Sequence, residues 1–307
     1  MADKIIETFN LSKIYKMRGK KEIVALDKVN LFINKGETFG LLGPNGAGKT
    51  TFASILTTLL SPTSGYAIVS GQNIVKNPKH AKLNIALMLD KSMLYNRLTG
   101  YDNLKFCCKF FNITNYKQKI EHMASQFGLK DWLNQFVEKY SSGMQMKLAL
   151  LRTLLLEREI LLLDEPTLGL DVNSKDYITN KLKKINKTII LTSHDMGVVE
   201  KLCDRIGIIN QGKIIKVGTK NEISQLYNSE IKIKIDLNKH KNDLKSELKK
   251  QHFVLSIDDI PEGFDVYIKE RNYYNELLKI LSNYPILKIS EKELPLGELF
   301  LKLIYTK

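Results

Sequence analysis

The stretch Gly43–Thr50, GPNGAGKT, decides the fold of this 307-residue chain. It has the spacing GxxxxGK[ST], and it lies between an apolar run within Ile33–Leu42 and a segment of helical spacing at Thr50–Leu60. Glycines let the backbone curl so that successive N–H groups face an anion, and the start of a helix adds a favourable dipole. The stretch therefore predicts a strand, a phosphate-binding loop and a helix.

Two side chains at the end of this loop have distinct predicted roles. Lys49 is expected to reach the β- and γ-phosphates of a nucleotide, and the Thr50 hydroxyl is expected to ligate Mg²⁺. A glycine-rich turn that binds nothing would not need both residue types at these positions. The nucleotide-binding positions of the loop are predicted to be Gly43, Pro44, Asn45, Gly46, Ala47, Gly48, Lys49, Thr50 and Thr51.

Polar residues also follow two further apolar runs, where strands buried on both faces are expected. Asp164 and Glu165 come directly after Leu161–Leu163, and His194 comes three positions after the run Thr188–Leu191. Ligand sites of α/β sheets form at the carboxyl ends of such strands. We expect Asp164 to orient Mg²⁺, Glu165 to act as general base on an attacking water, and His194 to contact the γ-phosphate or hold that water.

Taken in order and spacing, these motifs resemble those of the nucleotide-binding subunit of an ABC transporter. The resemblance covers about Ile5–Tyr227. The phosphate-binding loop GPNGAGKTT, Gly43–Thr51, corresponds to the Walker A motif of this family, and LLLDEP to its Walker B motif. The other motifs are the D-loop LGLD at Leu168–Asp171, the signature YSSGMQ at Tyr140–Gln145 and an H-loop that ends at His194. A GTPase or a small-molecule kinase would leave the signature unexplained, and the chain has no NKxD motif.

The resemblance implies a head-to-tail dimer of two such subunits that encloses two ATP molecules. Each site would combine the Walker motifs and His194 of one subunit with Ser141 and Gly143 from the other. Asp171 of the D-loop is also expected to contribute to nucleotide binding. Tyr15, in LSKIY, matches the aromatic residue that stacks on adenine in this family.

The chain departs from the family pattern at two places. The signature has Ser142 and Met144 where a glycine and a glutamine are common, while Ser141 and Gly143 are retained. In the segment that aligns with the Q-loop, Asp90 replaces the usual glutamine. A carboxylate oxygen is a good Mg²⁺ ligand, so Asp90 is predicted to contact the metal; the alternative is a side chain that points into solvent.

The pattern of residues changes after Tyr227. Strand and helix signals then follow in the order β-α-β-β-α-β, which suggests a small ferredoxin-like domain. The fold class predicted is therefore α/β: a P-loop ATPase core over residues 1–227, with a helical subdomain at about 91–156, and a small C-terminal α+β domain over residues 228–307.

Composition limits the function further. Apolar residues make up 43% of the chain, the net charge is +14, and no apolar run approaches the ~18 residues of a membrane span or forms a secretory signal. With no span of its own, an ATPase of this family needs an integral-membrane permease subunit, and we expect the chain at the cytoplasmic face of the cell membrane.

The ending LPLGELFLKL resembles that of export-type members, so drugs, antibiotics, peptides or ions are the expected cargo. The alternative is a soluble ABC-type ATPase that acts on nucleic acid or ribosomes. The chain has one cassette and no sustained heptads, so no nucleic acid is expected as a partner.

Overall fold

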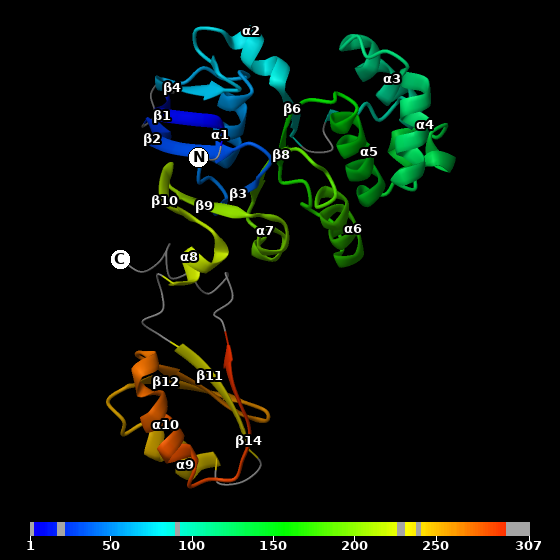
Figure 1. Cartoon of the computed structure of the whole chain (residues 1–307). Coiled ribbons are helices and arrows are strands. Elements are labelled where there is room, and N and C mark those ends of the chain that lie inside the picture. Colours follow the sequence, from blue (N-terminus) through cyan, green and yellow to red (C-terminus); the bar gives the residue numbers. More distant parts are fainter. Residues whose placement is uncertain (1–2, 17–21, 90–92, 226–230, 238–240, 293–307) are drawn as a thin grey trace. The chain divides into compact units, whose positions relative to one another are not determined.

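The computed structural model describes residues 3–16, 22–89, 93–225, 231–237 and 241–292 (Figure 1). The chain consists of two compact units, residues 1–217 and 218–307. None of the helices in the described ranges is long and apolar enough to cross a membrane.

A six-stranded sheet forms the centre of the first unit, in the order β10-β9-β3-β8-β7-β6. The strands are β3 (Thr38–Leu42), β6 (Ile85–Met88), β7 (Ile160–Asp164), β8 (Thr188–Ser193), β9 (Arg205–Asn210) and β10 (Lys213–Gly218). Strands β6, β7, β8, β3 and β9 pair in parallel, and every residue of β7 and β8 is buried. The predicted α/β class is confirmed.

The register of this sheet determines where the segments that follow β3, β7 and β8 begin. Leu42 pairs with Ser193, and Asp164 pairs with Thr192. Strands β3, β8 and β7 therefore end at one edge of the sheet, and the segments that follow them begin side by side.

A second, antiparallel sheet was not foreseen in the sequence. It contains β1 (Lys4–Tyr15), β2 (Ile23–Asn34), β4 (Ser64–Val69) and β5 (Gln72–Asn73), in the order β2-β1-β4-β5. Helix α1 (Lys49–Leu56) shares one apolar core with both sheets through the fully buried Phe52 and Ile55. This sheet brings Tyr15, at the end of β1, to the cavity beside the phosphate loop.

Helices fill the chain between β6 and β7. They are α3 (Gly100–Phe110), α4 (Tyr116–Gln126) and α5 (Ser142–Leu154), with 3₁₀ turns at Lys130–Trp132 and Val137–Lys139; a short α2 (Pro78–Ala81) and a 3₁₀ turn at Lys82–Asn84 precede β6. The described residues from 93 to 156 form no strand, and we refer to them below as the helical subdomain. After β7 come α6 (Val172–Leu182) and α7 (Met196–Leu202).

The second unit contains α8 (Lys220–Gln225), β11 (Ile231–Leu237), α9 (Lys241–Leu248), β12 (Val254–Ile260), β13 (Gly263–Ile268), a 3₁₀ turn at Arg271–Tyr273, α10 (Tyr274–Leu281) and β14 (Ile286–Lys292). Its sheet has the order β12-β13-β11-β14, with every pairing antiparallel. This is the order of a split β-α-β fold. Alternate residues of β11, from Ile231 to Leu237, enter a core with Phe253 and Phe264.

These two apolar cores share no residue, so the second unit is expected to be separable. The core around Phe52 includes no described residue beyond Val217, and the core around Phe264 begins at Ile231. A chain that ends at residue 227 should fold cooperatively, with a thermal midpoint within about 4 °C of the full chain, because none of that core is removed. Circular dichroism melting tests this. An insoluble fragment would show that residues 228–307 belong to the folding unit of the core.

Candidate functional site

The phosphate loop connects β3 to α1, as the motif predicted. Gly48 occupies the position before the helix with a φ of 108°, and Gly46 has a φ of 79°, so both adopt backbone conformations that disfavour larger residues. A Cβ atom on Gly48 would also lie 2.3 Å from the Ala25 carbonyl oxygen. Strand β2, which contains Ala25, therefore limits the conformation of the loop. The loop leads into the start of α1, where the free N–H groups of a helix favour an anion.

Lys49 is held inside this loop. Its side chain is 6% exposed, and the ammonium donates to the carbonyls of Gly43 at 2.8 Å and Pro44 at 3.1 Å. Glu165 Oε1 lies 3.4 Å from the same nitrogen. The ammonium is thus aimed across the loop at the carboxyl end of β7.

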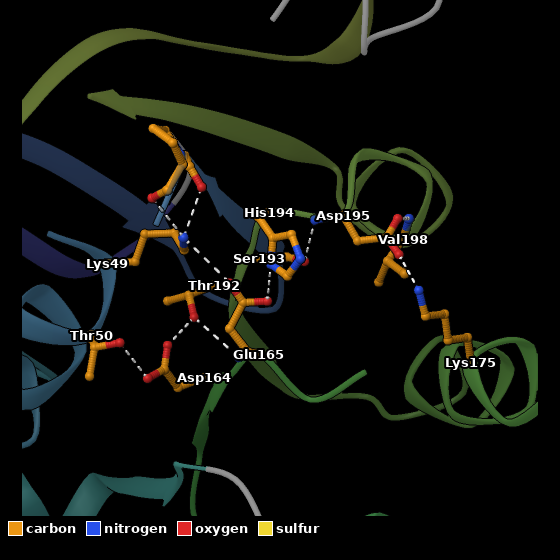
Figure 2. A network of polar contacts seen from close by, with 12 residues as sticks. Lys49, Thr50, Asp164, Glu165, Lys175, Thr192, Ser193, His194, Asp195 and Val198 are labelled. Carbon is orange, nitrogen blue, oxygen red and sulfur yellow. Dashed lines mark hydrogen bonds and ion pairs between the residues drawn. The ribbon is translucent and has the colours of Figure 1, made fainter. Parts of the chain in front are cut away.

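Asp164 ends β7 and faces α1. Its Oδ2 accepts a hydrogen bond from the Thr50 hydroxyl at 2.8 Å, and its Oδ1 accepts one from the Thr192 hydroxyl on β8 (Figure 2). Burial raises the pKa of this carboxyl, and the Glu165 charge raises it further. The two hydroxyl donors and Lys49 oppose that shift because they favour the ionised form.

Glu165 is the next residue and has a φ of 49°, in the left-handed region that residues other than glycine seldom adopt. Such backbone strain concentrates at functional sites. The Glu165 N–H donates to the Thr192 carbonyl at 3.1 Å and to its hydroxyl at 3.2 Å, which holds this turn. The carboxylate lies between Lys49 and His194, whose Nδ1 is 3.0 Å from Oε2 (Figure 2).

Thr192 is a site residue that the sequence analysis missed. It binds Asp164 through its hydroxyl and Glu165 through both its hydroxyl and its carbonyl. The available signal was a hydroxyl residue near the end of an otherwise apolar run, two positions before His194. Its importance depends on β8 lying next to β7, which the sequence pattern alone does not specify.

A cavity of about 260 Å³ opens beside the loop. Its lining includes Tyr15, the apolar residues Ile23, Val24 and Ala25, the loop residues Asn45 to Thr51 except Ala47, and Glu165. The Tyr15 hydroxyl is 3.5 Å from Thr51 Oγ1, and the Lys13 ammonium lies 5.4 Å from the centre of the Tyr15 ring. The cavity thus combines an aromatic ring and an apolar wall, which suit a nucleotide base, with a loop that suits its phosphates.

Residues predicted from the signature and the D-loop form a separate cluster. Ser141 caps α5 and accepts a hydrogen bond from the Met144 N–H at 3.2 Å. Asp171 caps α6, and hydrogen bonds from the Ser174 N–H and hydroxyl lower the pKa of its carboxyl. Within the described chain, no contact joins Ser141, Gly143 or Asp171 to the residues lining the cavity. Asp90, the predicted metal ligand from the Q-loop, lies outside the described residues.

Comparison with known proteins agrees with this arrangement. Residues 26–168 match a family described as ABC transporter. The chain is 37% identical over 217 residues to the ABC transporter ATP-binding protein NatA of Bacillus subtilis, covering 69% of this chain and 87% of NatA. It is 38% identical over 224 residues to the linearmycin resistance ATP-binding protein LnrL of the same organism, covering 71% of this chain and 70% of LnrL.

Solved structures show the same likeness. The ATP-binding subunit of an ABC transporter superposes with a TM-score of 0.64 at 25% identity, over 73% of this chain and 93% of that one. The ATP-binding cassette MJ0796, a dimer bound to ADP and Pi, superposes with a TM-score of 0.64 at 26% identity, over 70% of this chain and 98% of that one. The chain therefore belongs to the ABC transporter ATP-binding proteins and is an ATP-hydrolysing subunit of that family.

Proposed function

We propose that ATP binds in the cavity beside Tyr15 and is hydrolysed by water that Glu165 activates. The observation that carries this is the placement of the Glu165 carboxylate, 3.4 Å from the Lys49 ammonium and 3.0 Å from His194 Nδ1. Glu165, as the base, lies beside Lys49, the cation expected to approach the terminal phosphates. Proton removal and charge stabilisation then occur at adjacent atoms.

Each neighbour of Glu165 has a part in the step. The loop N–H groups and the start of α1 hold the phosphates, while Lys49 offsets the charge on the transferred group. Glu165 accepts a proton from the attacking water, and His194 contacts the γ-phosphate or orients that water. Thr192 keeps the Glu165 backbone turned toward the cavity.

Thr50 and Asp164 fit a Mg²⁺ ion. They offer a hydroxyl and a buried carboxylate 2.8 Å apart at the edge of the phosphate loop, and Mg²⁺ prefers oxygen ligands. When bound, the ion supplies positive charge to the β- and γ-phosphate oxygens. The further ligand proposed at Asp90 rests on the sequence alone.

A second subunit completes the site in this proposal. Ser141 and the N–H groups near Gly143 lie at the start of the 13-residue helix α5, which favours an anion. They are not part of the cavity of their own chain, so the γ-phosphate of another copy is the expected ligand. Support comes from the solved cassette MJ0796, whose structure is a dimer bound to ADP and Pi.

We further propose that the chain powers an integral-membrane permease that exports drugs, antibiotics, peptides or ions, from the cytoplasmic face of the membrane. One relative is the linearmycin resistance ATP-binding protein LnrL. Another, at 36% identity over 38% of its length, is the probable multidrug ABC transporter ATP-binding protein YbhF of Escherichia coli. Closure of the ATP-bound dimer would drive the permease, and hydrolysis would reopen it.

An aromatic patch on the helical subdomain suits that contact. Tyr95, Phe106, Phe110 and Phe111 touch in sequence, with ring centres 5.5, 6.4 and 5.0 Å apart. Phe110 is 70% exposed, and the other three are also exposed. A contiguous exposed apolar patch of this kind marks an interaction surface.

Replacing Glu165 by Gln should lower the ATP hydrolysis rate by roughly 10²- to 10⁴-fold, because an amide accepts no proton from water. ATP affinity should be kept, and the variant should accumulate as an ATP-bound dimer. Steady-state phosphate release and size-exclusion chromatography with ATP measure the two effects. Glu138→Gln, an exposed glutamate of the helical subdomain, is the matched control. Undiminished hydrolysis would remove Glu165 from the role of base.

Tyr15→Ala should weaken ATP binding by roughly ten-fold, because stacking on a base contributes ~1–3 kcal/mol. Tyr15→Phe should bind almost as well as the parent, since it keeps the ring and loses only the 3.5 Å contact with Thr51. Titration with a fluorescent ATP analogue measures both. Equal affinities for the two variants would show that the ring is not a nucleotide platform.

The double substitution Phe106→Ser and Phe110→Ser should reduce recovery of the chain in the membrane fraction when a candidate permease subunit is coexpressed. ATP hydrolysis by the free chain should stay unchanged, because the patch does not line the cavity. Ile215→Ser, on β10, removes an apolar residue that is nearly as exposed as Phe106, and it serves as the control. Unchanged membrane recovery would exclude the patch from permease contact.

A further inference from the structure

Helix α6 presents a row of three side chains to the helical subdomain. Ser174, Tyr177 and Lys181 are spaced by three and four residues, so they lie on one face of the helix. All three are half-buried. We call them the α6 row, and they touch residues of α4 and α5.

Tyr177 makes the central contacts of the α6 row. Its hydroxyl donates to the Gln126 carbonyl, at the end of α4, at 3.0 Å. The Lys147 ammonium of α5 lies 4.0 Å from the centre of the Tyr177 ring, a close cation–π distance. A phenol is protonated at neutral pH and so can donate this bond, and burial raises its pKa further. One side chain therefore binds two helices of the subdomain.

Ser174 and Lys181 extend this contact along α6. A Cβ atom on Gly143 would lie 2.8 Å from the Ser174 hydroxyl oxygen, so α5 approaches α6 closely there. That hydroxyl is itself fixed, because it donates to Asp171 Oδ2 at 2.8 Å. At the other end, the Lys181 ammonium lies 5.6 Å from the ring centres of both Phe127 and Tyr177.

The α6 row thus joins the starts of two helices with predicted roles at the nucleotide. Gly143 and Lys147 are four residues apart on α5 and face Ser174 and Tyr177, three apart on α6. Helix α5 begins after Ser141, and α6 begins after Asp171. Tyr177 therefore lies at the contact between the helix that begins at the signature and the helix that begins at the D-loop.

We propose that Tyr177 is a positioning residue for ATP hydrolysis, which holds Ser141 and Gly143 in the geometry that meets the partner's γ-phosphate. The inference rests on the proposed two-subunit site. Among the described residues, the hydrogen bond and ring contacts of Tyr177 go to Gln126, Lys147 and Lys181, which do not line the cavity proposed for ATP. Its loss should therefore slow turnover without weakening the first binding step, since small misplacements of groups around a reacting phosphate are costly.

The test compares Tyr177→Ala, Tyr177→Phe and Lys147→Met in the full chain, with Asn180→Ala, on the exposed side of α6, as control. Tyr177→Ala should lower kcat by roughly 10- to 100-fold, with ATP affinity in the absence of Mg²⁺ within two-fold of the parent. Tyr177→Phe keeps the ring over Lys147 and loses only the hydrogen bond to Gln126. Its kcat should therefore lie between that of the parent and that of Tyr177→Ala. Lys147→Met should also lower kcat, whereas Asn180→Ala should not.

Hydrogen exchange gives a second readout that does not depend on dimer formation. Amides of residues 142–147 should exchange faster in Tyr177→Ala than in the parent, while those of 49–56 should not change.

An unchanged kcat together with unchanged exchange at 142–147 would overturn the proposal. If Glu165→Gln fails to dimerise with ATP, the two-subunit site fails and the role of Tyr177 in ATP hydrolysis fails with it. Faster exchange at 142–147 in Tyr177→Ala would then show only that Tyr177 holds the start of α5. Equal loss of ATP affinity and kcat in Tyr177→Ala would indicate general destabilisation and would also count against it.

Discussion

The parallel register of β3, β8 and β7 is the constraint on which the site depends. Because Leu42 pairs with Ser193 and Asp164 with Thr192, the phosphate loop, the two acids and His194 all leave the sheet at one edge. A slip of one residue in β7 would turn Asp164 to the other face of the sheet, away from Thr50. The full burial of β7 and β8 makes such a slip costly.

The acidic side chains at this edge of the sheet are paired closely with hydrogen-bond donors and a cation. Two adjacent acids lie where water is scarce, and Asp164 is harder to ionise for that reason. Hydroxyls of Thr50 and Thr192 and the buried Lys49 compensate, so the negative charges stay beside donors and a cation. The same donors and cation surround the position proposed for the nucleotide, which would bring further negative charge. The apolar strands thus provide low dielectric, and a few polar side chains provide the chemistry.

The two groups of predicted nucleotide ligands are held by different parts of the fold. The Walker residues are fixed by the buried sheet, while Ser141 and Gly143 are carried by a helical subdomain that meets α6 through the α6 row. Half-buried contacts of this kind are weaker than the pairing of buried strands, so the signature is the part of the proposed site whose placement a few side chains can alter. This division is what the proposed two-subunit site requires, because the signature would then meet the nucleotide of another copy.

The sequence by itself determined the phosphate loop, the acids after β7 and His194 after β8, because glycine spacing and apolar runs are local features. It also indicated the β-α-β-β-α-β order after residue 227, since strand and helix periodicities are read within one element. Only the tertiary structure decided that Thr192 would bind Asp164 and Glu165, that β1 and β2 would bring Tyr15 to the loop, and that Tyr177 would contact Lys147. Those contacts join segments 27 to 36 residues apart in the chain. They depend on which strands and helices become neighbours, which is settled by packing of the whole core rather than by any local pattern.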